Sequence, residues 1–300
     1  MIVAGDYLFK VTDSVFHSDE RLTTICDFSP PRDLNKPIAD EASTLGADFV
    51  SIAYSPGKSV RVDSLVAAYE ISQNTNQEVI FTVSTRDMNK LAIQNYMLGA
   101  ARLGIHNVLI VRGDKFMDDE PSMTKNVNDY NTPGLVAALK AMNCGVDYRG
   151  YSMPSTTDFC IGSSISVSND LVKQAKLTYR KVQSGVDFFV TEPVYELTKF
   201  ANFMIEYEKL NGQTIDAPIF VGLQVPNLEG PIFGAMPESI RMDLVKGRKG
   251  IDIALELLHE FIDNGVNKIY FIPRIGKYGR RDYAGATQFL ADSKRMFIEG

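Results

Sequence analysis

The feature that most constrains the fold is an alternation of short apolar runs with longer amphipathic segments, repeated about eight times from residue 22 onward. The amphipathic segments predict helices at residues 62–72, 88–103, 171–184, 197–210 and 251–264. The apolar runs have the length of strands and lie at residues 22–28, 49–53, 79–83, 108–111, 159–163, 188–191, 219–224 and 268–272. This order of elements predicts an α/β fold with a parallel sheet.

The number of βα units favours a closed barrel over an open sheet. About eight units in a chain of 300 residues match a (β/α)8 TIM barrel. A doubly wound sheet usually opens with a glycine-rich turn, and the chain has no GxGxxG. The "GKS" at residues 57–59 is not a phosphate loop, because Ile52 stands where that pattern requires glycine. We therefore predict one barrel domain over residues 1–300, with residues 1–20 as an N-terminal extension.

Composition excludes several partners. The net charge of −6 and the lack of a long basic run argue against nucleic acid. Asp6 and Lys10 interrupt the apolar N-terminus, and no apolar run approaches the ~18 residues of a membrane span, which predicts a cytoplasmic protein. Three widely spaced cysteines and three unpaired histidines predict reduced thiols and no metal site.

Polar residues follow nearly every predicted strand, on the side where barrel enzymes carry their active sites. Asp27 comes first, in "ICDFSPPRD", where Pro30 and Pro31 stiffen the chain that leaves the strand. Asp27 can be a turn cap, or a carboxylate aimed into the barrel mouth. Asp27, Asp114 and Glu192 would converge there, and burial with mutual repulsion would favour a general acid.

Four motifs carry a resemblance to a known family. They are "CDFSPPRD", "TRDMN" at residues 85–89, "LGIHNVLIVRGD" at 103–114 and "KVQSGVDFFVTEP" at 181–193. In order and spacing they resemble the methylenetetrahydrofolate reductase family over about residues 20–275. The similarity is closest to the reductase module of bifunctional homocysteine methyltransferases.

The resemblance implies an oxidoreductase that reduces 5,10-methylenetetrahydrofolate to 5-methyltetrahydrofolate, with FAD as bound flavin and NADH or NADPH as hydride source. Asp27 would be the general acid, and Asp114 would stabilise the iminium cation formed when the ring opens. The substrate would lie against Glu192, Gln224 and Arg274. The implied flavin contacts are Ser84, Arg86, Arg112, Gly113, Ser164, Ser166 and Lys181.

Departures from the family pattern keep two alternatives open. Asp27 replaces a glutamate, Glu192 replaces a glutamine, and expected flavin contacts are replaced by Ala53, Thr82 and Ser166. The first alternative is a reductase of the same substrate that needs no flavin. The second is a folate-binding subunit that supplies a methyltransferase partner. A homo-oligomer is also compatible with the sequence.

Overall fold

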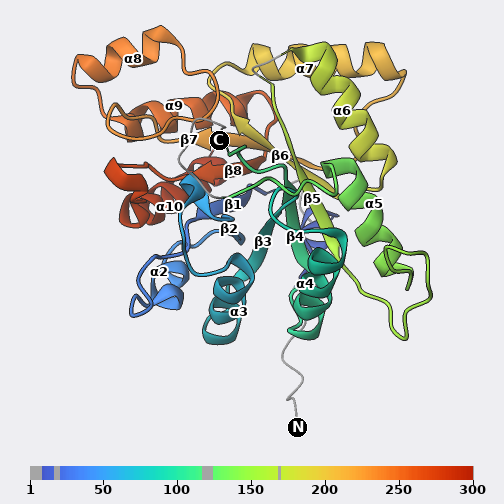
Figure 1. The fold of residues 1–300 in the computed structure, drawn as a ribbon. Coiled ribbons are helices and arrows are strands. Elements are labelled where there is room, and N and C mark those ends of the chain that lie inside the picture. The colour runs from blue at the N-terminus through green and yellow to red at the C-terminus, as the bar shows by residue number, and fades with distance from the viewer. Residues whose placement is uncertain (1–8, 17–20, 117–123, 168–169, 300) are drawn as a thin grey trace.

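The computed structural model describes residues 9–16, 21–116, 124–167 and 170–299. Eight parallel strands close into a barrel in the order of the sequence, and helices surround it (Figure 1). The (β/α)8 prediction is therefore confirmed. The strands are β1 Thr23–Phe28, β2 Phe49–Ile52, β3 Glu78–Ser84, β4 Asn107–Val111, β5 Cys160–Ile165, β6 Phe188–Pro193, β7 Ile219–Gln224 and β8 Lys268–Ile272.

The predicted ends of several strands were wrong by up to two residues. The first strand ends at Phe28, as predicted; Asp27 therefore lies within β1, where it pairs in register with Ser51 of β2, and does not follow the strand. Ser164 and Glu192 likewise lie within β5 and β6. The prediction ends a strand where its apolar run ends. In a barrel, however, the residues near the carboxyl end of a strand stay hydrogen-bonded to the neighbouring strands even when their inward side chains are polar.

The helices begin and end within two residues of the five predicted ranges. Asp63, Asn89, Asn131 and Asp170 each accept a hydrogen bond from a backbone N–H of the first turn that follows them. The helices are α1 Val11–Phe16, α2 Ile38–Ser43, α3 Ser64–Asn74, α4 Lys90–Arg102, α5 Thr132–Asn143, α6 Leu171–Gln183, α7 Leu197–Asn211, α8 Glu238–Val245, α9 Gly250–Asp263 and α10 Tyr283–Glu299. In the described part of the chain, none of them is long and apolar enough to cross a membrane.

Two apolar layers form the core. The larger lies between the strands and the helices. The smaller fills the barrel interior toward the amino ends of the strands. It is formed by inward-facing strand residues, namely Ile25, Phe49, Ile80, Leu109, Cys160, Phe188, Val190 and Phe220. Gly162 of β5 is required there, because a Cβ at this position would lie 2.2 Å from the Phe188 ring.

Helix α1 packs against the end of the barrel interior where the strands begin. Val11 is fully buried in the inner cluster, and its N–H donates to Asn107 Oδ1 at 3.0 Å. This helix belongs to the predicted extension, of which residues 1–8 and 17–20 lie outside the described residues. With α1 packed at this end, the polar inner positions lie toward the opposite end of the barrel, where the strands finish.

Candidate active site at the barrel mouth

The inner face of the barrel changes from apolar to polar near the carboxyl ends of the strands. Side chains alternate along a strand, so residues two and four positions beyond the apolar layer also face inward. This rule places Asp27 two positions beyond Ile25, facing inward. Ser84, Ser164 and Gln224 occupy equivalent positions on β3, β5 and β7. The ends of these strands therefore carry several of the residues predicted from the sequence.

Asp27 lies at the centre of a buried hydrogen-bonded group. Its Oδ1 accepts from the Tyr270 hydroxyl at 3.2 Å, and its Oδ2 accepts from Arg281 Nε at 2.9 Å. Arg281 Nη2 also lies 2.9 Å from Oδ2, and the two side chains are only 6% and 8% exposed for Arg281 and Asp27. Burial and the charge of Asp27 raise the pKa of Tyr270 well above its usual range, so Tyr270 is held as a donor.

The segment that carries Arg281 folds back onto β1. An antiparallel bridge joins Ile275 to Arg281, and the Gly276 N–H donates to the Arg280 carbonyl at 2.8 Å. Beyond it, the Tyr283 ring stacks on Phe28 with centroids 4.8 Å apart. This return positions the Arg281 guanidinium beside Asp27.

Sequence reasoning missed Arg281 and Tyr270. The available signal was the basic segment "RIGKYGRRDY" after the last strand, where TIM barrels often bind anions. The partner of Asp27 within that segment was not readable, because Arg281 lies 254 residues away in sequence.

A bulge in β6 positions Glu192. The ladder between β6 and β7 shifts register between Val190 and Pro193, and the Gly222 N–H donates to Thr191 Oγ1 at 2.8 Å instead of to a carbonyl. Bulges of this kind re-aim a side chain near active sites. Glu192 Oε1 accepts from Ser166 Oγ at 2.8 Å and from the Val167 N–H at 2.9 Å.

The other two predicted substrate residues hold loops in this structure. Gln224 is buried; its amide donates to the Pro231 carbonyl at 2.9 Å and accepts from the Phe233 N–H at 2.8 Å. Arg274 pairs with Glu229 at 2.7 Å on the wall of a cavity beside β1 and β8. Both residues therefore fix the segment that follows β7.

Arg86, a predicted flavin contact, makes three hydrogen bonds to protein oxygens. Its Nε and Nη2 donate to the Asp87 carboxylate at 2.6 and 2.8 Å, and its Nη1 donates to the Asp114 carbonyl at 2.7 Å. Its guanidinium carbon also lies 4.3 Å from the centre of the Phe116 ring. The Asp114 side chain is exposed at the rim.

Two further predicted flavin contacts pack against each other. The Ser84 hydroxyl donates to the Arg112 carbonyl at 3.1 Å and accepts from the Arg86 N–H at 3.1 Å. Gly113 has φ of +77°, and a Cβ there would lie 2.2 Å from Ser84 Oγ. The Arg112 side chain is exposed.

Lys181 of α6 is buried rather than presented to a phosphate. Its side chain extends to the carbonyl of Ser164, to which Nζ donates at 2.5 Å, and the residue is 5% exposed. Burial lowers the pKa of Lys181 to about 8.

Four of the residues predicted to contact a flavin, Ser84, Arg86, Ser166 and Lys181, make hydrogen bonds within the protein. Arg86 uses three of its five N–H donors in this way and Lys181 donates to one carbonyl, so these bonds do not exclude a flavin phosphate. Of this set, only Arg112 directs an exposed charged side chain outward.

A (β/α)8 barrel with a buried carboxylate, Asp27, paired with an arginine at its C-terminal mouth has the architecture of a barrel enzyme. The family sequence model described as methylenetetrahydrofolate reductase matches residues 17–227. The chain belongs to the methylenetetrahydrofolate reductase family, a family of oxidoreductases, as its motifs had predicted.

Two individual proteins resemble the chain. Methylenetetrahydrofolate reductase 1 of Schizosaccharomyces pombe is 22% identical over 291 residues, which cover 87% of this chain and 45% of the yeast protein. The chain thus spans less than half the length of that curated relative. An uncharacterized protein from Clostridium thermocellum, whose structure binds two copies of 5-methyl-5,6,7,8-tetrahydrofolic acid, superposes with a TM-score of 0.64 at 12% identity. That match covers 97% of this chain and 100% of the other, and it shows the shared fold.

Proposed function

We propose that the chain reduces 5,10-methylenetetrahydrofolate to 5-methyltetrahydrofolate, with NADH or NADPH as the source of hydride. The observation that carries this proposal is the pair of inward carboxylates, Asp27 on β1 and Glu192 on β6, in a member of this family. The bound ligand of the Clostridium neighbour, 5-methyltetrahydrofolate, is the product proposed here.

The two carboxylates suit different parts of the substrate. A carboxylate has only acceptor oxygens, and the pterin presents amino and amide N–H groups to it. We assign pterin binding to Glu192, whose bulged strand turns it toward the mouth. Asp27 then faces the reacting bridge, where opening breaks the bond between the methylene carbon and N10. N10 takes the proton, and hydride transfer to the carbon completes the N5 methyl group.

Asp27 keeps the role of general acid in this proposal, with one added requirement. Arginine offers only donors, so Asp27 Oδ2 acts as an acceptor while Arg281 is bound. Donation from Oδ2 therefore requires Arg281 to release that oxygen, whereas Oδ1 accepts only the Tyr270 hydroxyl and keeps a lone pair for the proton. Asp114, at the rim, would add negative charge facing the cationic intermediate.

A reductase without flavin is the second candidate. It is favoured by the burial of Arg86 and Lys181 and by their hydrogen bonds within the protein, which direct these side chains toward protein oxygens. The nicotinamide would then pass its hydride directly to the methylene carbon. The absorption spectrum of the purified protein, with and without added FAD, separates the two candidates.

The test of the proposed function compares two aspartate variants under the same assay. Proton donation by a positioned side chain contributes ~10² to 10⁴ in rate, so Asp27→Asn is expected to lower kcat by that factor. Asp263→Asn is the matched control, because Asp263 is exposed at the end of α9, away from the mouth. Equal kcat values for the two variants would remove Asp27 from the mechanism.

A further inference from the structure

The two oxygens of the Asp27 carboxylate are bound differently. Arg281 Nε donates to Oδ2 at 2.9 Å, and Arg281 Nη2 lies at the same distance of 2.9 Å from that oxygen. Oδ1 accepts one hydrogen bond, from the Tyr270 hydroxyl at 3.2 Å. A carboxylate oxygen has two lone pairs, so among the residues that the structure describes both lone pairs of Oδ2 have donors, and Oδ1 keeps one lone pair.

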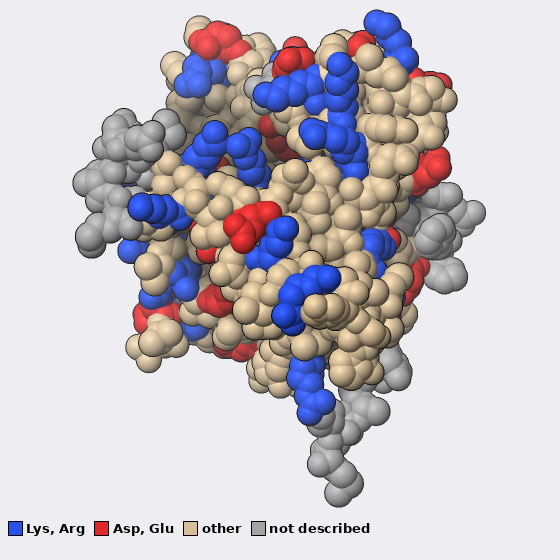
Figure 2. All heavy atoms as spheres, turned by 45° about the vertical axis from the view of Figure 1, so that its right-hand side comes forward, with Lys and Arg blue, Asp and Glu red and all other residues tan. Residues whose placement is uncertain are grey.

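Burial favours a single arrangement of this carboxylate. Acidic and basic side chains are scattered over the face drawn in Figure 2, where water and salt screen them. Asp27 and Arg281 are only 8% and 6% exposed, so separating them would leave two charges unpaired away from water. Burial lowers the pKa of Arg281, but the charge of Asp27 raises it, and the net shift is upward. The guanidinium therefore keeps its charge beside Oδ2.

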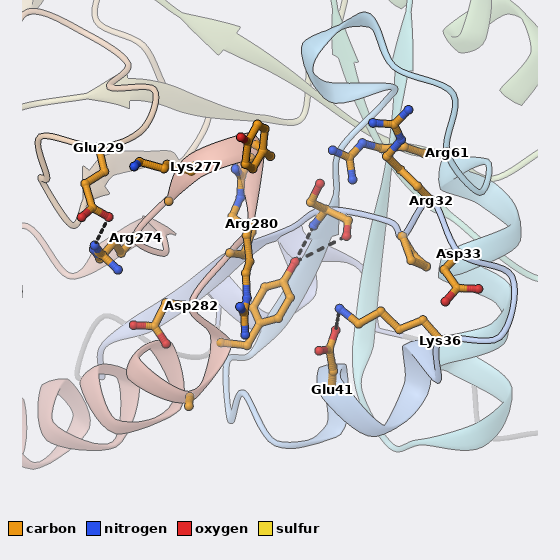
Figure 3. Close-up of a pocket in the computed structure, with 18 residues that line it drawn as sticks. Arg32, Asp33, Lys36, Glu41, Arg61, Glu229, Arg274, Lys277, Arg280 and Asp282 are labelled. Atoms are coloured by element: carbon orange, nitrogen blue, oxygen red, sulfur yellow. Dashed lines mark hydrogen bonds and ion pairs between the residues drawn. The ribbon is translucent and has the colours of Figure 1, made fainter.

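The chain that follows β8 fixes Arg281 from both sides. On one side the Gly276 N–H donates to the Arg280 carbonyl at 2.8 Å, and on the other the Asp282 N–H donates to the Arg274 carbonyl at 3.0 Å. Figure 3 shows this return of the chain, with Arg274, Arg280 and Asp282 labelled along it. The backbone of Arg281 is therefore held by main-chain hydrogen bonds, which limits the positions that its guanidinium can take.

Tyr270 reaches Asp27 from the neighbouring strand. In the parallel ladder between β1 and β8, Tyr270 is level with Ile25, which lies two positions before Asp27. The Tyr270 ring packs against the inner apolar cluster, and its hydroxyl extends from there to Oδ1. The Tyr270 hydrogen bond thus comes from the side of the apolar interior, which leaves the remaining lone pair of Oδ1 for a ligand at the mouth.

We propose that Arg281 and Tyr270 are positioning residues, which hold the Asp27 carboxyl so that Oδ1 is the oxygen that gives its proton to N10 of the folate. This inference rests on the proposed reductase function. The proton passes from Oδ1 to N10 while the bond between N10 and the methylene carbon breaks, and the electron pair of that bond stays on N10. Asp27 is left as a carboxylate, stabilised by the donors of Arg281 and Tyr270, until solvent returns the proton.

Two conservative variants disturb the positioning and leave the acid in place. Tyr270→Phe deletes the hydroxyl and keeps the ring, and Arg281→Lys keeps the positive charge but loses the planar fork of N–H donors. The matched controls are Tyr69→Phe, at an exposed tyrosine of α3, and Arg295→Lys, at an arginine of α10 that forms an exposed ion pair with Asp292. Urea denaturation of each variant checks that it is folded under the assay conditions.

The test measures steady-state reduction of 5,10-methylenetetrahydrofolate by the full chain in H2O and in D2O. We expect each site variant to lower kcat by at least about tenfold, because a misplaced acid loses part of the rate that proton donation supplies. The KM for the folate should change by less than about threefold, since pterin binding is assigned to Glu192. The solvent deuterium isotope effect on kcat should rise in both site variants and stay at the wild-type value in both controls, because only the site variants slow the proton transfer.

The possible failures are distinguishable. If the wild type turns over, an unchanged kcat or an unchanged isotope effect in Tyr270→Phe or in Arg281→Lys overturns the role of that residue and leaves the proposed function intact. A lower kcat with an unchanged isotope effect is the result of a merely structural role, because loss of folded protein reduces the active fraction without altering the proton step. If the wild type forms no 5-methyltetrahydrofolate, the proposed function fails, and the positioning roles fail with it.

Discussion

Asp27→Asn should destabilise the barrel by about 3 kcal/mol, because it leaves a buried arginine without its counter-charge. The amide of asparagine has nearly the shape of the carboxylate and can still accept from Tyr270, so no cavity is created. What changes is the charge beside Arg281, whose side chain is 6% exposed and cannot reach water without moving.

The size of this loss of stability follows from the burial of both Asp27 and Arg281. Removing one member of a buried ion pair typically costs 3 to 5 kcal/mol, and the lower end applies here because one hydrogen bond of the group is kept. For a chain of 300 residues, a loss of about 3 kcal/mol lowers Tm by ~5 °C.

Urea denaturation of four proteins measures this coupling: the wild type, Asp27→Asn, Arg281→Met and the double variant. Because the double variant removes both charges, its loss should be smaller than the sum of the single losses by at least about 1.5 kcal/mol. Lys199→Ala serves as the control, since its ion pair with Glu196 is 42% and 45% exposed and should be worth less than about 1 kcal/mol. A single-variant loss of under 1 kcal/mol, or strictly additive losses, would refute the buried-pair reasoning.

Three further predictions concern other parts of the barrel. The pKa of Lys181 in the folded protein, about 8, lies below its ordinary 10.5, so the free energy of unfolding of the wild type should rise as the pH increases between these two values. Lys181→Met should therefore be more stable than the wild type by about 2 to 3 kcal/mol at pH 7 and should lose this advantage near pH 10. A stability difference in urea titrations that does not change with pH would contradict this. Gly162→Ala should lower the free energy of unfolding by at least about 2 kcal/mol, because the new Cβ meets the Phe188 ring. The control Gly99→Ala in α4, where the added Cβ meets open space, should be neutral or stabilising in the same thermal melts. Similar changes in Tm for the two variants would be inconsistent with the packing described. Asp114→Asn should lower kcat by ~10² with Tm unchanged, and unaltered turnover would remove this carboxylate from the reaction.

The architecture was readable from the sequence because each βα unit is specified locally. Alternating apolar runs of strand length, separated by amphipathic helices with Asp or Asn at several N-termini, leave few other topologies. The inward direction of Asp27 and Ser164 also follows from the alternation of side chains, even though the predicted end of β5 was two residues short; the bulge in β6 prevents the same argument for Glu192.

The hydrogen-bond and ion-pair partners of the site residues could not be predicted from the sequence. Arg281 approaches Asp27 only because β1 and β8 are neighbours in the closed barrel, and a hairpin-like return follows β8. Motif comparison assigned Arg86 and Lys181 to a flavin from their positions alone. It could not predict the hydrogen bonds of Arg86 to Asp87 and of Lys181 to the Ser164 carbonyl, because those contacts depend on side-chain conformations.

The most direct test of the central claim is an anaerobic assay of the purified chain with 5,10-methylenetetrahydrofolate and NADH or NADPH, performed with and without FAD. The folate product is identified by mass spectrometry. We expect one 5-methyltetrahydrofolate per nicotinamide oxidised, and a nicotinamide deuterated at C4 should place its label in the methyl group if the hydride passes directly. A chain that binds the folate but forms no methyl product under any of these conditions would contradict the proposed reductase and would favour a folate-holding subunit.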